Sequence, residues 1–388
     1  MYEVDDSKNI GLPESKRNVG VIFNLTISGV QIDFQRDLIY KYNDDVKGEM
    51  YELFDIIPVV STAFTEKVSL LTARKPKKIA IKVTAGKDGV TGTARLQLPA
   101  DWSVNPQSAP FSIEKKDGEK IIYFTVTAPE KSNDVTASAI ATVDGKQYSQ
   151  ELIRIRYPHI SKQSILKSAE AKFIATPIQI GKEKIAYIMG AGDEVNKCVS
   201  QMGYEVTLLK PDDISKEKLA EFDVIMLGIR AYNVLGNLVL KQNILIDAVK
   251  DGKTMIVQYN TSADLLLKNI APFPIKISRD RVTEEKAVVE FLAPNHRVLN
   301  YPNKITPKDF QDWVQEQGLY YPSEWDPAFT PILSSHDQNE SPKNGALLVA
   351  KYGKGHYIYT GLSFFRELPA GVTGAFRLMA NMISIGNK

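Results

Sequence analysis

The chain has a single cysteine, Cys198, among its 388 residues. This scarcity excludes an intrachain disulfide framework and a zinc site built from several thiolates. The sequence also lacks any apolar run approaching the ~20 residues that a membrane-spanning helix needs. An excess of one charge is missing too, because 48 basic residues oppose 46 acidic ones and the net charge is +2. That balance gives no electrostatic footprint for nucleic acid or an anionic membrane, so neither is an expected partner.

Two further absences concern cofactors and metals. The four histidines, His159, His296, His336 and His356, are scattered without the spacing of a zinc site. Gly190-Ala191-Gly192 resembles the start of a dinucleotide fingerprint, but Val195 stands where the third glycine belongs. We therefore expect no metal and no cofactor.

The amino terminus lacks the basic and apolar regions of a signal peptide, since residues 1–6 read Met-Tyr-Glu-Val-Asp-Asp. No signal peptide is expected in this chain, and its residues alone do not fix the compartment.

What is present divides the chain into a β-rich part and an α/β part. Val19, Val21, Phe23, Leu25 and Ile27 alternate as in a half-buried strand, which predicts a β-rich segment or small sandwich over 1–75. Short alternating runs separated by turn residues predict an immunoglobulin-like β-sandwich over 76–158. A linker is expected at 159–181.

From residue 182 apolar strands alternate with helices, which predicts a doubly wound, flavodoxin-like parallel sheet over 182–388. The expected helices cover 194–202, 214–221, 236–250 and about 373–385. Residues 263–345, rich in proline and aromatics, are expected to form an insertion. Cys198 falls on the apolar face of the first helix, where core packing is its expected role.

In an open parallel sheet, ligands bind outside the carboxyl ends of the strands. Polar residues follow the predicted strands at 190–193, 229–233, 259–262 and 363–367. An arginine followed by tyrosine and asparagine is suited to grip a carboxylate or a sugar hydroxyl. The predicted pocket comprises Arg230, Tyr232, Asn233, Asn260, Thr261, Arg279, Arg281, His296, Arg366 and Glu367. Structural ion pairing or capping is an equally good interpretation of Arg230 and Glu367.

Several longer segments resemble the C-terminal portion of bacterial LmbE-like (PIG-L family) zinc deacetylases, as found in Bacteroidetes. They are residues 10–14, 40–42, 46–49, 277–283, 293–296, 318–322 and 359–369. The resemblance implies β-sandwich modules followed by a domain similar to class I glutamine amidotransferases. It also implies an extracytoplasmic location, and a longer parent architecture of which this chain is a truncated or split gene product.

The catalytic residues of that family have no counterparts here. No His-Pro-Asp-Asp zinc motif occurs, and amidotransferase chemistry needs a cysteine nucleophile where this chain offers Asn260 or Thr261. The loop after the last strand carries Arg366 and Glu367 but no histidine. We therefore predict no catalytic residues and a non-catalytic accessory region that supports a zinc N-deacetylase and binds a glycan or another polar ligand.

Two alternatives stay open. One is a hydrolase of acetylated sugars with Glu367 as base and Thr261 as nucleophile. The other is a structural spacer whose pocket is filled by its own side chains, such as Trp313 or Trp325.

Overall fold

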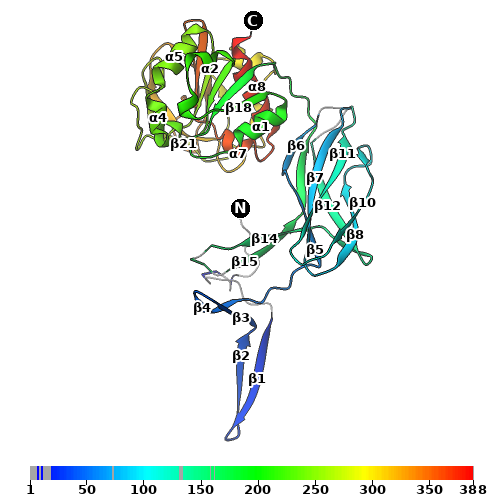
Figure 1. The fold of residues 1–388 in the computed structure, drawn as a ribbon. Helices are drawn as coiled ribbons and strands as arrows, with labels where there is room; N and C mark the ends of the chain where they lie inside the picture. Colours follow the sequence, from blue (N-terminus) through cyan, green and yellow to red (C-terminus); the bar gives the residue numbers. More distant parts are fainter. Residues whose placement is uncertain are drawn as a thin grey trace.

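The computed structural model describes residues 7, 10–11, 19–71, 74–130, 134–157, 159–160 and 162–387. Within this part the protein is a multidomain, β-rich molecule with many separate sheets (Figure 1). Residues 12–14, which belong to one of the segments that carry the family resemblance, lie outside the described residues. No helix in the described ranges is long and apolar enough to cross a membrane.

Two hairpins come first, and the first of them departs from expectation. Among the described residues, strands β1 (Gly20–Ile27) and β2 (Val30–Asp37) pair only with each other, as do β3 (Ile39–Asp44) and β4 (Gly48–Leu53). The alternation in β1 predicted a half-buried strand, yet every residue of β1 and β2 is exposed. Figure 1 shows why: the hairpin projects away from the other domains, so no second layer of the described chain covers it.

A two-sheet sandwich follows, with one sheet ordered β5-β7-β11-β9 and the other β10-β8-β12-β16-β6, where β13 also pairs with β12. Its strands are β5 (Val60–Phe64), β6 (Val68–Leu70), β7 (Lys77–Ala85), β8 (Val90–Gln97), β9 (Ser103–Asn105), β10 (Ala109–Ile113), β11 (Glu119–Thr127), β12 (Val135–Val143), β13 (Lys146–Tyr148) and β16 (Glu170–Ile174). Alternate residues of these strands are buried, as in β7 and β11, and together they form one hydrophobic core.

The expected boundaries of the sandwich, 76–158, are too narrow. β5 and β6 precede residue 76, and β16 lies inside the expected linker 159–181. β16 belongs to the sandwich because it pairs with both β12 and β6 and buries Ala171 and Phe173. β14 (Gln150–Ile155) and β15 (Gln163–Ser168) form a separate hairpin instead.

The α/β domain contains a seven-stranded sheet in the order β18-β17-β19-β20-β27-β26-β24. The strands are β17 (Lys184–Ile188), β18 (Glu205–Leu208), β19 (Val224–Leu227), β20 (Thr254–Gln258), β24 (Phe329–Pro331), β26 (Leu347–Tyr352) and β27 (Gly355–Thr360). The first four pairings are parallel, and β26 runs antiparallel to both its neighbours. The sheet is therefore mixed, with an antiparallel edge beside a parallel centre.

Helices cover both faces of this sheet. They are α1 (Val195–Met202), α2 (Lys216–Ala220), α3 (Ala231–Val234), α4 (Gly236–Val239), α5 (Gln242–Asp251), α6 (Arg297–Asn300), α7 (Phe364–Glu367) and α8 (Thr373–Ile383). Residues of α1 and α8 pack in one core, and residues of α2 and α5 pack in another. The single helix expected over 236–250 is divided into α4 and α5, with Leu240 and Lys241 between them.

The expected insertion 263–345 contributes two small antiparallel sheets as well as β24. One pairs β21 (Ile275–Val282) with β23 (Gly318–Trp325), and the other pairs β22 (Glu290–Phe291) with β25 (Leu333–Ser334). The β21–β23 sheet matters for function because Leu319 and Tyr320 of β23 pack on residues that follow the central strands.

Candidate functional site

An aromatic cluster lies where β20 and β27 end. Tyr259 follows β20 directly, and its ring lies 5.9 Å from the ring of Tyr320 with only 9° between the planes. The ring of Phe365 is 5.2 Å from Tyr259 at an angle of 45°. Tyr259 is buried, whereas Tyr320 and Phe365 are partly exposed, so the cluster presents aromatic surface to solvent. We call these three residues the aromatic corner.

Two arginines, Arg230 before α3 and Arg366 in α7, lie beside the aromatic corner. Burial raises the pKa of Tyr259, while the positive charges of Arg230 and Arg366 act in the opposite direction. Arg366 is anchored, because its Nε donates to Glu316 Oε1 over 2.9 Å. The Nε of Arg230, in contrast, is buried and has no hydrogen-bond partner among the described residues.

The backbone is unusual at two residues of this region. Arg230 has φ of 57° and Tyr320 has φ of 53°, both in the left-handed region that non-glycine residues rarely adopt. Arg230 N donates to Tyr259 O, and the hydroxyl of Tyr359 donates to Tyr320 O. Left-handed residues held in this way are found at functional sites more often than elsewhere.

Asp193 ties the first loop of this edge to the strands. It accepts hydrogen bonds from the Tyr187 hydroxyl over 2.5 Å, from Val195 N and from Ile229 N. Gln258 Nε2 donates in turn to the Tyr187 hydroxyl. Burial is the main cause of the raised pKa of Tyr187, so the phenol keeps its proton. These contacts fix the backbone just before Arg230.

Four of the predicted pocket residues have structural roles. Tyr232 is fully buried and donates its hydroxyl proton to Gln242 Oε1. Asn260, also fully buried, accepts from Tyr232 N and donates to Gln258 O. Asn233 bonds to the backbone of Thr261 through both ends of its amide, and the Thr261 hydroxyl donates to Ala263 O. These groups are used in holding the loops together.

Glu367 is buried completely, and both its oxygens are occupied. Oε2 accepts from Val314 N over 3.0 Å, and Oε1 lies 3.1 Å from Ser363 Oγ. Since Ser363 Oγ also donates to Glu316 O, a protonated Glu367 would supply the hydrogen of the second contact. Burial raises the pKa of Glu367 to about 8. This geometry suits a carboxylic acid that anchors the 314–317 loop and gives no support to a base that acts on a ligand.

The last three predicted pocket residues, Arg279, Arg281 and His296, lie in two different places. Arg279 and Arg281 are exposed on β21, and Arg281 is the register partner of Leu319, the residue before Tyr320. Both lie on the strand that pairs with β23, which carries Tyr320. His296 does not: its Nδ1 accepts from Val298 N at the start of α6, and it influences His356 at the amino-terminal end of β27. This neighbour places His296 toward the amino-terminal end of β27, whereas the aromatic corner lies where β20 and β27 end.

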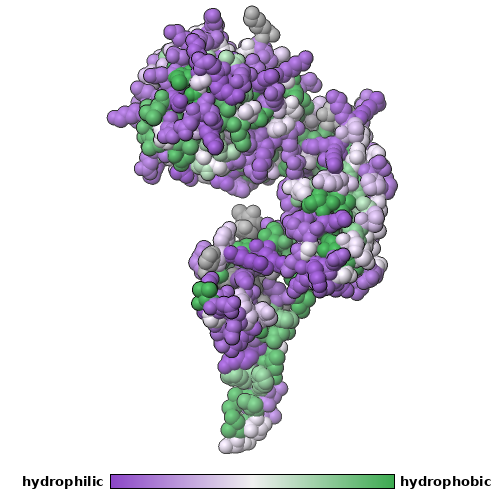
Figure 2. All heavy atoms as spheres, viewed as in Figure 1, coloured by the Kyte–Doolittle hydropathy of each residue, from purple (hydrophilic) through white to green (hydrophobic). Residues whose placement is uncertain are grey.

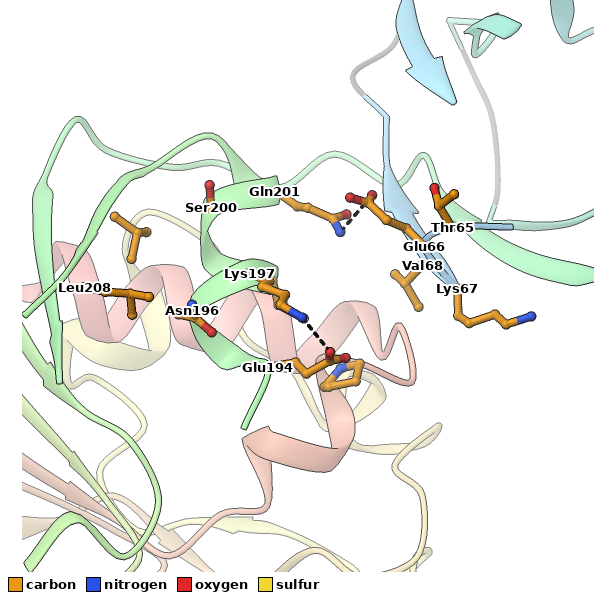
Figure 3. A pocket seen from close by; sticks show the side chains of 13 residues that line it. Thr65, Glu66, Lys67, Val68, Glu194, Asn196, Lys197, Ser200, Gln201 and Leu208 are labelled. Carbon is orange, nitrogen blue, oxygen red and sulfur yellow. Dashed lines mark hydrogen bonds and ion pairs between the residues drawn. The ribbon is translucent and has the colours of Figure 1, made fainter. Parts of the chain in front are cut away.

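A cleft of about 630 Å³ lies between the sandwich and α1 (Figure 3). Some of its polar groups are paired: Gln201 donates to Glu66 across the domain junction, and Lys197 bonds to Glu194 at the start of α1. Asn196 Oδ1 and Gln201 Oε1, in contrast, are buried without a hydrogen-bond partner among the described residues. Cys198 also lines it, and burial raises the pKa of this thiol to about 12, which disfavours the reactive thiolate.

Sequence reasoning missed the aromatic members of the corner. Tyr259 and Phe365 stand within the segments expected at the carboxyl ends of strands, but only polar residues there were selected. Tyr320 could not be found from its position, because β23 pairs outside the main sheet. Phe365 carried an available signal, because it stands immediately before the predicted ligand-binding Arg366. In the described residues, no cluster of three or more His, Cys, Asp or Glu could hold a metal ion.

No family model matches the chain, and no curated protein matches it. Among solved structures, a mutant alpha-2-macroglobulin from Salmonella aligns with 34% of this chain and 8% of its own, at 12% identity and a TM-score of 0.22. A ScaB cohesin from R. flavefaciens aligns with 23% of this chain and 86% of its own, at 12% identity and a TM-score of 0.18. A family 123 glycoside hydrolase from Clostridium perfringens aligns with 51% and 38%, at 8% identity and a TM-score of 0.20.

Proposed function

We propose that this chain is a non-catalytic binding region in which the aromatic corner, with Arg230 and Arg366, holds a glycan. The main support is the stacked pair of Tyr259 and Tyr320. Arg230 lies beside it, with a buried Nε that has no hydrogen-bond partner among the described residues. A sugar ring places apolar C–H groups against an aromatic face while its hydroxyls or carboxylate accept from a guanidinium. The corner offers both kinds of contact at one end of a rigid sheet.

The segments that resemble LmbE-like deacetylases support this choice. Three of them, 277–283, 318–322 and 359–369, contain most of β21, part of β23 and the whole of α7. These elements surround the aromatic corner. A binding role for the corner would therefore explain why these three segments resemble the deacetylase family. We further propose that the sandwich is immunoglobulin-like, that the α/β domain is amidotransferase-like, and that the enzyme served is a zinc N-deacetylase outside the cytoplasm.

Isothermal titration with oligosaccharides of N-acetylglucosamine tests the binding role. We expect Tyr320→Ala and Arg230→Ala each to weaken binding by about tenfold or more, since each removes a stacking or charged contact. Tyr301→Ala is a matched control, because the Arg297 Cζ atom also lies over this tyrosine ring, at 4.1 Å, but away from the corner. Equal loss in the control, or no binding by the wild-type chain, would contradict the proposal.

The accessory role needs a separate experiment. A purified LmbE-like zinc deacetylase is mixed with the chain, and co-elution and release of acetate are measured. We expect co-elution, with all acetate release lost on zinc chelation. Release of acetate by the isolated chain would instead favour the hydrolase alternative.

A further inference from the structure

The β1–β2 hairpin has one almost wholly apolar face. Cross-strand partners share a face, and Phe23 lies opposite Phe34, Leu25 opposite Ile32, and Ile27 opposite Val30. With Val21, these side chains form the hairpin face, each of them between 42% and 61% exposed. Its members are Val21, Phe23, Leu25, Ile27, Val30, Ile32 and Phe34. The single charged residue at its base, Arg36, lies over the Phe34 ring, 3.8 Å from Cζ to the ring centre.

The opposite face of the same hairpin is polar apart from Ile22. Asn24 and Thr26 of β1 lie opposite Asp33 and Gln31 of β2, and Asn24 Nδ2 donates to Asp33 Oδ1 over 2.6 Å. One apolar face and one polar face are typical of a sheet in a β-sandwich, where the apolar face packs against a second sheet. Figure 2 shows apolar residues gathered along this projecting hairpin.

A two-stranded hairpin is marginally stable alone and is stabilised by packing of its apolar side. In the described part of the chain β1 and β2 pair only with each other, and all their residues are exposed. The hairpin face is roughly 500 Å², which is at the upper end of what single soluble proteins leave open.

We propose that the hairpin face packs against the same face of a second copy of this chain. The seven members of the face are uncharged and Arg36 stands at its base, so a two-fold arrangement that places the base of one face against the tip of the other keeps the two arginines apart. Two such faces bury roughly 1,000 Å² in total, about the minimum for a specific association. Deep insertion of the hairpin into lipid is disfavoured, because Asp33 and Gln31 on the other face would enter the membrane with it.

The oligomeric state of the full chain tests this proposal. Sedimentation equilibrium between about 1 and 100 μM is expected to show a dimer of the 43.3 kDa chain. Leu25→Lys places a charge in the middle of the hairpin face and is expected to raise the dimer Kd by at least about tenfold. Thr26→Lys, the neighbouring residue on the polar face, is the control and is expected to leave the Kd unchanged.

Cysteine cross-linking keeps the test decisive if Leu25→Lys fails to fold. Leu25→Cys is expected to form an intermolecular disulfide on mild oxidation, whereas Thr26→Cys is not, and the native Cys198 is buried. Equal cross-linking of both variants overturns the proposal. So does a wild-type chain that stays monomeric at about 100 μM, including one that floats with phosphatidylcholine vesicles.

Discussion

Glu367 is a carboxyl group enclosed by the fold, with one oxygen bonded to Val314 N and the other to Ser363 Oγ. Its pKa rises to about 8 because burial disfavours the charged form more than these hydrogen bonds favour it. The unfolded chain releases the same proton near the ordinary value of 4.5. Between these two values the folded state binds more protons, so this group lowers stability as the pH rises.

Glu367→Gln should remove that pH dependence. The amide keeps the acceptor for Val314 N and supplies a donor to Ser363 Oγ without titrating. We expect the stability of the variant relative to wild type to increase by about 2–4 kcal/mol between pH 5 and pH 8.5. Urea unfolding at both pH values measures the difference, and the contributions of His296 and His356 cancel because both proteins contain them. A constant difference across this range would contradict the raised pKa.

At the scale of single elements, β16 shows how much a short strand can carry. Phe173 is fully buried between the two sheets, 5.8 Å from the ring of Phe64 and 6.1 Å from that of Trp102. The strand has only five residues, and its neighbours β12 and β6 lie far away in the sequence. Its place in the sandwich is therefore a consequence of long-range pairing.

Phe173→Ala is expected to destabilise the sandwich by about 3–5 kcal/mol, since it leaves a cavity between the sheets. Ile165→Ala on β15 is the matched control: this residue also falls in the range expected as linker, but it is 38% exposed. Its cost should be below about 1 kcal/mol. Chemical denaturation followed by tryptophan fluorescence compares the two, and equal small losses would mean that β16 does not hold the sheets together.

The sequence predicted the succession of strands and helices in the α/β part because its central strands, such as β19 and β20, are short runs of mostly apolar residues. It did not predict the division of 236–250 into α4 and α5, which depends on how Leu238 packs in the core while Leu240 is 80% exposed. The alternation of β1 was identified correctly, but alternation cannot say whether a covering layer exists in the same chain. Likewise the carboxyl edge was predictable, whereas the contact of Tyr320 with Tyr259 required the pairing of β23.

At the scale of the whole molecule, the sandwich and the α/β domain share a core. Val68 of β6 and Ile174 of β16 pack in the same apolar cluster as residues of α1 and α8. Figure 1 shows α1 beside β6 at this junction. Asp134 adds a polar link, because it accepts hydrogen bonds from Thr176 of the sandwich exit and from Thr373, the first residue of α8. We expect the two domains to unfold together.

Asp134→Ala should uncouple them. The substitution removes the hydrogen bonds that join the end of the sandwich to the start of α8, at a cost of about 1–3 kcal/mol for a charged acceptor with several donors. Calorimetry of the wild-type chain is expected to give one endotherm for both domains, and the variant two. Asp212→Ala is the control, since Asp212 accepts a hydrogen bond from Asn237 within the α/β domain and is not at the junction. If both variants keep a single endotherm, the apolar contacts of Val68 and Ile174 suffice for coupling; if wild type already gives two, the shared core does not transmit unfolding.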